Sequence, residues 1–484
     1  MLLPILSAIL GILTFLPFNF YLVAFVFLVP LFIFFLKEKR FWRLIFGSLI
    51  FRLIFFLGTG YFTLEPILWA ETILIFLGLP IAVWTAKKLF ANFHSSFVIH
   101  YLPFIALPFL WTFFDHLEAH CSLTPTYIAT AGNSLGSSPF VGLAGFGGLI
   151  TLTFFVALIN AILTFIIFNY SFKRKIFFTK QNIFAFIFII FLFFSAWQIS
   201  NFELKKNSSN YNKLSHVIKF AAVSVGKKFD FNQLSALKDE LANKPLDLII
   251  FPEDTIGQPV SFDDNNNIIP FGNYSTFIFQ NLAKELGTNL IASYDTLQGN
   301  NHDLKYDSAL LFDAQENITG IHNKNRLMFI GEYWPLGDWH PTFYDWLKEK
   351  DPGIKAYAIF DQRNADMRGE RNLLALELKK NSIPFATAIC SEIHYPNDLK
   401  KYQENGARFI INQSSNRWID IGLNHYLYLT ANLKKIESIW LSTPIISSGV
   451  NNSAGIIFPN GQEQKIGYEN IDKNYGIFFG EIRY

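Results

Sequence analysis

This sequence has few cysteines and a small net charge, and each of these features excludes a class of function. Only two cysteines occur in 484 residues, Cys121 and Cys390. Two are too few for a disulfide framework or a metal cluster held by thiolates, and the sequence predicts no cofactor. A single bridge between them is the less favoured alternative, because it would silence the thiols. The net charge of +2 is too small and too dispersed to indicate a nucleic-acid surface.

Long hydrophobic runs, in contrast, fill roughly the first 200 residues. Hydrophobic residues make up 51% of the chain and charged residues only 16%, against about 25% in ordinary soluble domains. A run of about 17 to 25 apolar residues crosses roughly 30 Å of hydrocarbon, because a helix rises about 1.5 Å per residue. We predict about seven membrane-spanning helices, at residues 2–17, 20–36, 44–63, 71–86, 97–114, 142–168 and 182–199. A cleaved signal peptide is the alternative for the first, but the basic start and cleavage site are lacking, so retention is favoured.

The distribution of basic residues predicts how the spans are oriented, because loops rich in Lys and Arg stay in the cytoplasm. The loops after the second, fourth and sixth spans hold ten such residues, and the opposite loops hold none. The ten are Lys37, Lys39, Arg40, Arg43, Lys87, Lys88, Lys173, Arg174, Lys175 and Lys180. The N-terminus is therefore expected in the cytoplasm, and everything after Trp197 outside it.

Charged residues within or beside the spans have ordinary interpretations. Arg52 lies inside the third predicted span, where its long side chain is expected to snorkel toward the cytoplasmic surface. His116, Glu118 and His120 alternate along a predicted outer loop. Solvation of these three is favoured over metal binding.

Beyond the spans, the composition becomes that of a soluble α/β domain. Residues 1–199 are predicted to form the membrane domain, the polar stretch 200–216 a linker, and 217–484 a catalytic domain outside the cytoplasm. Strands are predicted at 216–225, 246–251, 290–295, 384–389, 407–412, 444–449 and 454–458, with a strand pair within 307–322. Helices are predicted at 231–244, 276–287, 399–405 and 424–442. This alternation favours one α/β domain whose sheets are covered by helices.

Three reactive side chains in this domain each follow a hydrophobic run. They are Glu253 in LDLIIFPED, Lys324 in IHNKNRLMFIGEYWP and Cys390 in PFATAICSE. Glu253 and Cys390 each end a predicted strand, where open α/β sheets place their sites. Taken alone, each has an ordinary explanation as a helix cap, a solvated lysine or a buried thiol. Together, a general base, a fixed cation and a thiol suffice for acyl transfer through a thioester.

This combination, in this order, resembles the nitrilase superfamily. With the multi-span N-terminal half, the chain is similar to the apolipoprotein N-acyltransferase family. The local matches are FPED at Glu253, the pattern K-x-x-L-x-x-x-G-E-Y that begins at Lys324, and C-x-E at Cys390. The resemblance implies an α-β-β-α sandwich with the three residues at its edge. It also implies a multi-pass protein of the bacterial cytoplasmic (inner) membrane, with the catalytic domain in the periplasm.

The resemblance further implies a role for each residue. Cys390 would be the nucleophile, Glu253 the general base and Lys324 the oxyanion stabiliser, with the backbone N–H of Ser391 as a second oxyanion donor. Residues expected around these three are Glu332, Tyr333, Ser391, Glu392 and Trp418. Cys390 would take an acyl chain from a phospholipid and pass it to the N-terminal amine of a diacylglyceryl-cysteine lipoprotein, both substrates being held in the bilayer. Neither a metal nor nucleic acid is expected as a partner.

The sequence also departs from the family pattern. Ser391 stands where the family usually has Tyr, and the segment SSNRWID has Asn416 and Arg417 in place of an aspartate and a small residue. The first soluble strand is followed by VSVGKK rather than a Q-G-N-like stretch, and the chain stops at GIFFGEIRY without an eighth span. Two alternatives therefore stay open, namely a membrane-tethered nitrilase- or amidase-type hydrolase and a non-catalytic paralogue that uses the fold for docking.

Overall fold

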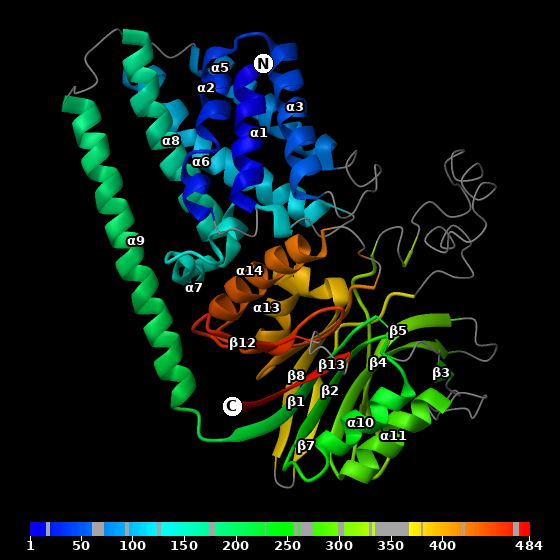
Figure 1. The fold of residues 1–484 in the computed structure, drawn as a ribbon. Helices are drawn as coiled ribbons and strands as arrows, with labels where there is room; N and C mark the ends of the chain where they lie inside the picture. The colour runs from blue at the N-terminus through cyan, green and yellow to red at the C-terminus, as the bar shows by residue number, and fades with distance from the viewer. Residues whose placement is uncertain are drawn as a thin grey trace, which may run out of the picture. The chain divides into compact units, whose positions relative to one another are not determined.

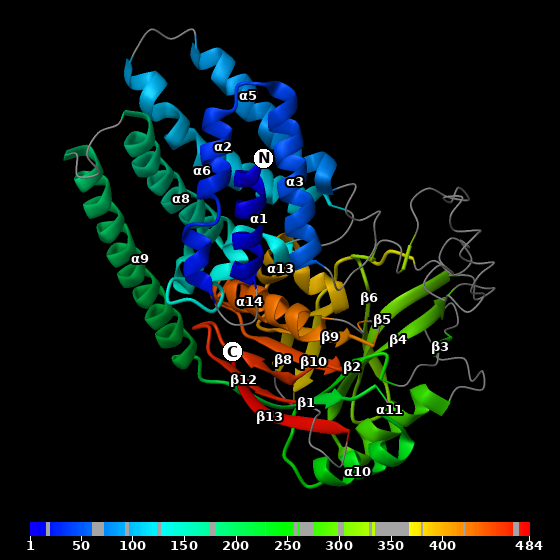
Figure 2. The same ribbon diagram turned by 45° about the horizontal axis from the view of Figure 1, so that its top comes forward.

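The structure, a computed structural model, divides into two compact units (Figures 1 and 2). It describes residues 1–15, 20–60, 72–91, 96–122, 127–173, 180–227, 229–255, 260–261, 274–298, 304–328, 332–333, 367–378, 381–417, 419, 422–467 and 474–484. The first unit comprises 1–208, 419–442 and 459–461, and the second comprises 209–418, 443–458 and 462–484.

The first unit is helical, and a helix coincides with every predicted span. Its main helices are α1 (Leu2–Phe15), α2 (Val29–Lys37) with the short η1 (Tyr21–Phe25) before it, α3 (Phe41–Thr59), α5 (Gly78–Ala91), α6 (Ser96–Cys121), α8 (Leu149–Lys173) and α9 (Lys180–Asn212). Among the described residues, four helical stretches are long and apolar enough to cross a membrane, at 41–59, 72–89, 149–168 and 181–212, and two shorter apolar ones lie at 2–15 and 21–37. On α9, Phe184 and Phe191 are 70% and 60% exposed, as suits a face in contact with lipid rather than water.

The sixth span begins later than predicted. Short turns η2 (Tyr127–Ala129), η3 (Ala131–Leu135) and η4 (Val141–Leu143) and the single turn α7 (Ala144–Gly147) precede α8. Gly148 separates α7 from α8 with φ +61°, and a Cβ there would lie 2.8 Å from the ring of Trp440. Glycine is therefore required at this position, and it sets the start of the helix at Leu149 rather than at residue 142.

The interpretation of Arg52 as a snorkelling residue is wrong. Its side chain is 3% exposed and forms an ion pair with Glu118 of α6, which is fully buried. Its guanidinium also lies over the ring of Phe56, 4.1 Å from the centroid. The start of the predicted outer loop is likewise part of α6, where the Nε2 atom of His116 contacts Thr153 Oγ1 at 3.4 Å. Pairing within the bundle, not access to water, accommodates Arg52 and Glu118, whereas His120 is exposed as predicted.

The boundary between the units differs from the predicted linker. Helix α9 continues to Asn212, so most of 200–216 is helical. Its polar side chains there are used in packing, since Ser200 Oγ donates to the Pro139 carbonyl at 2.8 Å and Asn207 Nδ2 donates to the Ile439 carbonyl at 3.0 Å. Ile439 belongs to α14 (Leu423–Leu441), a helix that groups with the first unit although its sequence neighbours belong to the second.

The second unit is built on a 13-stranded sheet in the order β6-β5-β4-β2-β1-β10-β9-β8-β7, with β13 also paired to β1, β3 to β4, and β11 and β12 extending from β10. The strands are β1 (Val217–Val225), β2 (Leu248–Glu253), β3 (Val260–Ser261), β4 (Asn289–Gln298), β5 (Leu304–Phe312), β6 (Ile318–Asn323), β7 (Leu374–Leu378), β8 (Asn381–Ile389), β9 (Ile410–Ser415), β10 (Ile445–Val450), β11 (Ala454–Ile457), β12 (Glu463–Ile466) and β13 (Tyr475–Arg483). The helices are α10 (Phe231–Leu241), α11 (Tyr274–Leu286) and α13 (Pro396–Glu404), and the 3-10 turn η7 spans Cys390–His394.

Both faces of the sheet are buried, which explains the nearly continuous apolar strands. In β1, Val223 and Val225 face a core that includes Leu237 of α10 and Phe279 of α11, while Phe220 faces a second core. That second core joins opposite halves of the sheet through side chains such as Phe220, Ile250, Leu376, Phe385 and Ile411. Figure 1 shows α10 and α11 side by side on one outer face. The predicted α/β sandwich with helices outside is therefore confirmed.

Candidate active site

The sheet topology brings the predicted reactive residues to one edge. Strands β4, β2, β1, β10, β9 and β8 are paired in this order and run parallel to one another, so their carboxyl ends lie together. Glu253 ends β2, and Cys390 directly follows β8. Strand β5 runs antiparallel to both β4 and β6, so β6 ends at this edge and Lys324 follows it. The sequence predicted this for two of the three residues, and the strand pairing accounts for the third.

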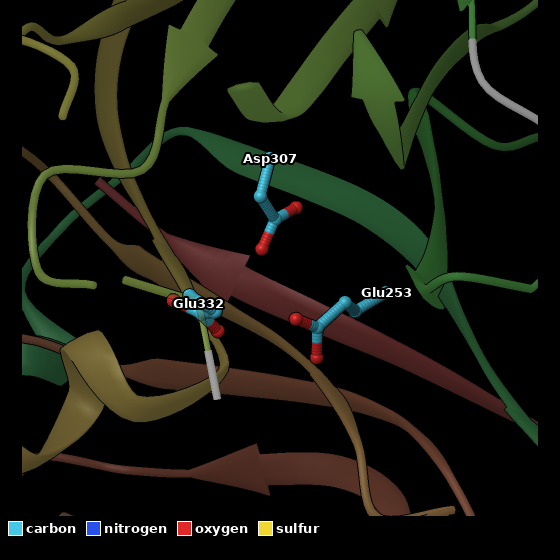
Figure 3. Close-up of side chains that lie close together, drawn as sticks. All are labelled: Glu253, Asp307 and Glu332. Atoms are coloured by element: carbon cyan, nitrogen blue, oxygen red, sulfur yellow. The ribbon is translucent and has the colours of Figure 1, made fainter. Parts of the chain in front are cut away.

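Lys324 lies at the centre of the site, among three carboxylates. Its side chain is fully buried, and Nζ contacts Glu332 Oε1 at 2.6 Å, Asp307 Oδ2 at 3.0 Å and Glu253 Oε1 at 3.4 Å. Figure 3 shows the three carboxylates turned toward a common centre. Burial alone would lower the pKa of Lys324, but Glu332, Asp307 and Glu253 raise it well above its usual value. The side chain is therefore a fixed cation.

Glu253 is held on both sides and is a poor acid at rest. Its Oε2 accepts the backbone N–H of Ser415, at the end of β9, at 2.6 Å, while Oε1 faces Lys324. Burial raises the pKa of Glu253 well above its ordinary value; Lys324 opposes this, and the carboxylates of Asp307 and Glu332 add to it. A carboxyl group with a raised pKa accepts a proton readily, as a general base must.

Cys390 is the first residue of η7, where the chain turns sharply after β8. Its φ is +48°, an uncommon conformation for a residue with a side chain and one that clusters at functional sites. Asn412 of β9 supports the turn by donating to the carbonyls of Ala388 at 2.9 Å and Cys390 at 3.4 Å. Burial raises the pKa of the Cys390 thiol well above its usual value, and Glu253 adds to the effect while Lys324 opposes it. The thiol is therefore protonated at rest.

Glu332 and Glu392 hold the loops on which the site depends. Glu332 Oε2 accepts the backbone N–H of Met328 at 2.8 Å while its other oxygen faces Lys324, which closes the loop after β6. Glu392 Oε1 accepts the backbone N–H of Asn325 at 2.7 Å, and Oε2 accepts that of Ile389 at 2.8 Å. Glu392 thus joins the segment after Lys324 to the segment before Cys390.

The remaining predicted residues are Ser391, Tyr333 and Trp418. Ser391 is buried in η7, and its Oγ donates to the Arg326 carbonyl at 3.4 Å. The ring of Tyr333 lies 6.0 Å from the Arg368 guanidinium. Trp418 lies outside the described residues. Arg417, which departs from the family pattern, donates to Asp254 Oδ2 at 3.0 Å, next to Glu253.

Two residues of the site were missed by sequence reasoning. Asp307 contacts Lys324 from within β5, and it also accepts the Lys324 backbone N–H at 2.8 Å through its carbonyl. His322, two residues before Lys324, contacts Glu392 Oε2 through Nε2 at 3.1 Å. Polar residues inside otherwise apolar strands were the available signal for both.

The carboxylates also require a test as metal ligands. One oxygen from each of Glu253, Asp307 and Glu332 lies within 4.8 Å of the others, a spacing that suits a metal ion. The ammonium of Lys324 is within 3.4 Å of all three. Because these carboxylates already surround a cation, the geometry assigns them to Lys324.

Two family models match the chain, one in each part of the sequence. Residues 7–162 match the model of the apolipoprotein N-acyltransferase N-terminal domain, and residues 218–433 match that of carbon-nitrogen hydrolase. Apolipoprotein N-acyltransferase 1 of Treponema denticola is 26% identical over 179 residues, which are 36% of this chain and 29% of the relative. The apolipoprotein N-acyltransferase of Geobacter metallireducens is 20% identical over 364 residues, which are 74% of this chain and 64% of the relative. The matches thus cover less than two thirds of each relative.

Similar solved structures include Saccharomyces cerevisiae Nit3 of the nitrilase superfamily, with a TM-score of 0.39 and 15% identity over 56% of this chain and 91% of that one. An amidase from Nesterenkonia sp. has a TM-score of 0.35 and 12% identity over 56% of this chain and 92% of that one.

Proposed function

Because the chain belongs to the apolipoprotein N-acyltransferase branch of the nitrilase superfamily, we propose that it transfers a fatty acyl chain from a phospholipid, through a thioester on Cys390, to the N-terminal amine of a diacylglyceryl-cysteine lipoprotein. One observation carries this proposal. The thiol of Cys390, the carboxyl of Glu253 and the ammonium of Lys324 meet in a buried cluster, in a chain whose other unit has several membrane-length apolar helices.

In the first half-reaction, Glu253 takes the proton of the Cys390 thiol as the sulfur attacks the ester carbonyl of the phospholipid. The carbonyl oxygen becomes an oxyanion, which Lys324 and the backbone N–H of Ser391 stabilise. When the C–O bond breaks, the proton on Glu253 passes to the leaving alcohol and a lysophospholipid departs. A positioned base contributes about 10² to 10⁴ in rate, and an oxyanion donor about 3 to 4 kcal/mol.

In the second half-reaction, the amine of the lipoprotein attacks the thioester carbonyl. Glu253 accepts a proton from the amine, the C–S bond breaks, and the proton returns to the sulfur as the thiol. The product is an amide, which is more stable than the thioester and makes the transfer favourable.

The proposed location follows from the substrates. Both are anchored in a bilayer, so a membrane-tethered enzyme meets them at a high effective concentration. We place the protein in the bacterial cytoplasmic (inner) membrane with the N-terminus in the cytoplasm and the catalytic unit in the periplasm, in agreement with the ten basic residues of the alternate loops.

Mass spectrometry of lipoprotein N-termini tests the proposal in cells that depend on this chain. The intact protein should add a third acyl chain, and Cys390→Ala should abolish it because the sulfur that carries the thioester is lost. In a Cys121→Ser background, a hydroxylamine-labile acyl group should be trapped on Cys390 when acceptor is withheld. Cys121→Ser alone is the matched control, since this exposed cysteine is free and lies in α6. Lipoproteins that remain diacylated with the intact protein present would rule out the proposal.

The carbon-nitrogen hydrolase match over 218–433 includes Glu253, Lys324 and Cys390 and supports one alternative, a membrane-tethered amidase- or nitrilase-type hydrolase. Water would then replace the amine in the second half-reaction. Release of free acid or ammonia without lipid transfer would favour this alternative.

A further inference from the structure

The ammonium of Lys324 is fully engaged inside the protein at rest. An ammonium has three N–H donors. Three carboxylate oxygens, from Glu332, Asp307 and Glu253, accept them at 2.6, 3.0 and 3.4 Å. Stabilising an oxyanion therefore requires that one carboxylate releases its N–H during the reaction.

The contact with Glu253 is the one that chemistry releases. It is the longest of the three, and Glu253 becomes neutral when it takes the thiol proton, which weakens its hold on a cation. Asp307 and Glu332 take no part in that proton transfer. Asp307 is the more rigid support, because it lies in β5 and also binds the backbone N–H of Lys324.

Resting on the function proposed above, we propose that Asp307 is a positioning residue that keeps the Lys324 ammonium in place while Cys390 and Glu253 exchange a proton. Its carboxylate binds the side chain and its carbonyl binds the main chain, so the lysine is anchored at both ends. The third N–H of the ammonium then turns from Glu253 to the oxyanion.

The electrostatics agree with this geometry. Burial is the largest cause of the raised pKa of Glu253, and Lys324 opposes it. The Asp307 carboxylate adds to the effect of burial. It also helps to raise the pKa of Lys324 above the value that burial would give. Among the described residues, the other charged or titratable groups around the cluster include Glu332, Cys390, His322, Tyr395, Asp295 and Asp254, the last paired with Arg417. All remain in an Asp307 variant, so a change in its pH profile reports on Asp307.

Asp307→Asn separates charge from shape, since the amide keeps an oxygen that accepts from Lys324 but lacks the negative charge. The rate of thioester formation on Cys390 from phospholipid is measured against pH in the full chain, with Cys121→Ser as background. A unit charge about 5 Å away shifts the pKa of a partly buried group by about two and a half pH units at an effective dielectric constant near 20. The acid limb of the profile should therefore move to lower pH by that amount, with KM unchanged.

Asp307→Ala also removes the side-chain hydrogen bond to Lys324, although the backbone contact remains, and should lower kcat roughly tenfold to a hundredfold, because a hydrogen bond to a charged group is lost. Asp307→Glu keeps the charge and should retain the wild-type acid limb. The matched control is Asp295→Asn, which removes an equal charge from the residue directly opposite Asp307 in β4. Asp295 is 48% exposed and pairs with Lys305, so its profile should stay close to that of the wild type.

The rate at which iodoacetamide alkylates Cys390, measured against pH, tests the same electrostatics without any acyl substrate. The Asp307→Asn profile should again lie at lower pH than that of the wild type. If both profiles of a folded Asp307→Asn variant superimpose on the wild-type profiles, the role of Asp307 is refuted. If the wild type forms no thioester but alkylation shifts, the acyltransferase function fails and the electrostatic role of Asp307 stands.

Discussion

Replacing His322 with Gln should weaken the second unit in a pH-dependent way, because the structure requires this imidazole to carry two protons. Nε2 faces the Glu392 carboxylate at 3.1 Å, and Nδ1 faces Asn372 Oδ1 at 2.9 Å. The Asn372 amide cannot be turned round, since its Nδ2 donates to the Ile321 carbonyl at 2.7 Å. Both ring nitrogens therefore donate, and His322 and Glu392 form a buried ion pair.

The magnitude follows from burial. The His322 side chain is fully buried and that of Glu392 is 5% exposed. Removing one partner of a buried pair costs about 3 to 5 kcal/mol, because a charge is left uncompensated. A unit of this size melts about 2 to 4 °C lower for each kcal/mol, so His322→Gln should lower Tm by about 6 to 20 °C. Activity should fall with it, because Glu392 joins the segments that carry Lys324 and Cys390.

The sign of the pH dependence is set by the direction of the shift. Burial alone would lower the pKa of His322, but Glu392 raises it above the ordinary value of 6.5. The stabilisation is then fully present below pH 6.5 and is lost as pH rises through the raised pKa. The difference in Tm between wild type and His322→Gln should therefore be largest in mild acid and shrink toward alkaline pH.

Thermal unfolding of the detergent-solubilised chain, followed at several pH values, measures this difference. His216→Gln is the control, because His216 is exposed and its ring is hydrogen-bonded to the neighbouring Ser215 rather than to a carboxylate. A Tm difference for His322→Gln that is independent of pH would show that the imidazole is not charged and would refute the reasoning.

Two further predictions concern the base and the helical bundle. Burial raises the pKa of Glu253, Lys324 opposes this, and Asp307 and Glu332 add to the rise. The value of kcat/KM should therefore fall as the pH drops through a value above the ordinary pKa of 4.5. A pH–rate profile with its acid limb at or below pH 4.5 would contradict this. Arg52→Leu should lower Tm and yield by leaving Glu118 buried and unpaired, and Arg52→Leu with Glu118→Leu should recover much of the loss; a double variant no better than the single one would argue against the pair.

The sequence predicted the helices of the first unit well, because length and apolarity alone decide whether a segment crosses hydrocarbon. It could not predict how charges inside the bundle are satisfied. The side chain of Arg52 is long enough to snorkel to the membrane surface, but it pairs with Glu118 instead. Glu118 lies 66 positions away in the sequence, and only packing brings the two together. Likewise, the polar residues after 199 read as a linker because their partners lie on distant segments.

In the second unit, strands with buried runs were predicted and strands defined by their neighbours were missed. Strand β13 is unremarkable in sequence, yet it pairs with β1 along its whole length. The site shows the same division. Glu253 and Cys390 follow apolar runs and carry local motifs, whereas Asp307 joins the site only because β5 runs antiparallel to β4 and β6, which places the start of β5 at the edge where those strands end.

Burial of Cys390 connects the electrostatics to the proposed location. The thiolate is the form of cysteine that is oxidised and also the form that acts as a nucleophile. A raised pKa therefore slows both oxidation and nucleophilic attack. In an oxidising compartment outside the cytoplasm, a permanent thiolate would be lost to oxidation between turnovers. A protonated, 8% exposed thiol is protected, and under the proposed mechanism it becomes reactive only when Glu253 takes its proton beside a bound ester. The deprotonation needed in each cycle of that mechanism slows the chemistry, but bilayer-held substrates at high effective concentration would offset that loss. Burial thus makes the isolated thiol a poor nucleophile, but it also protects the thiol from oxidation at the proposed location.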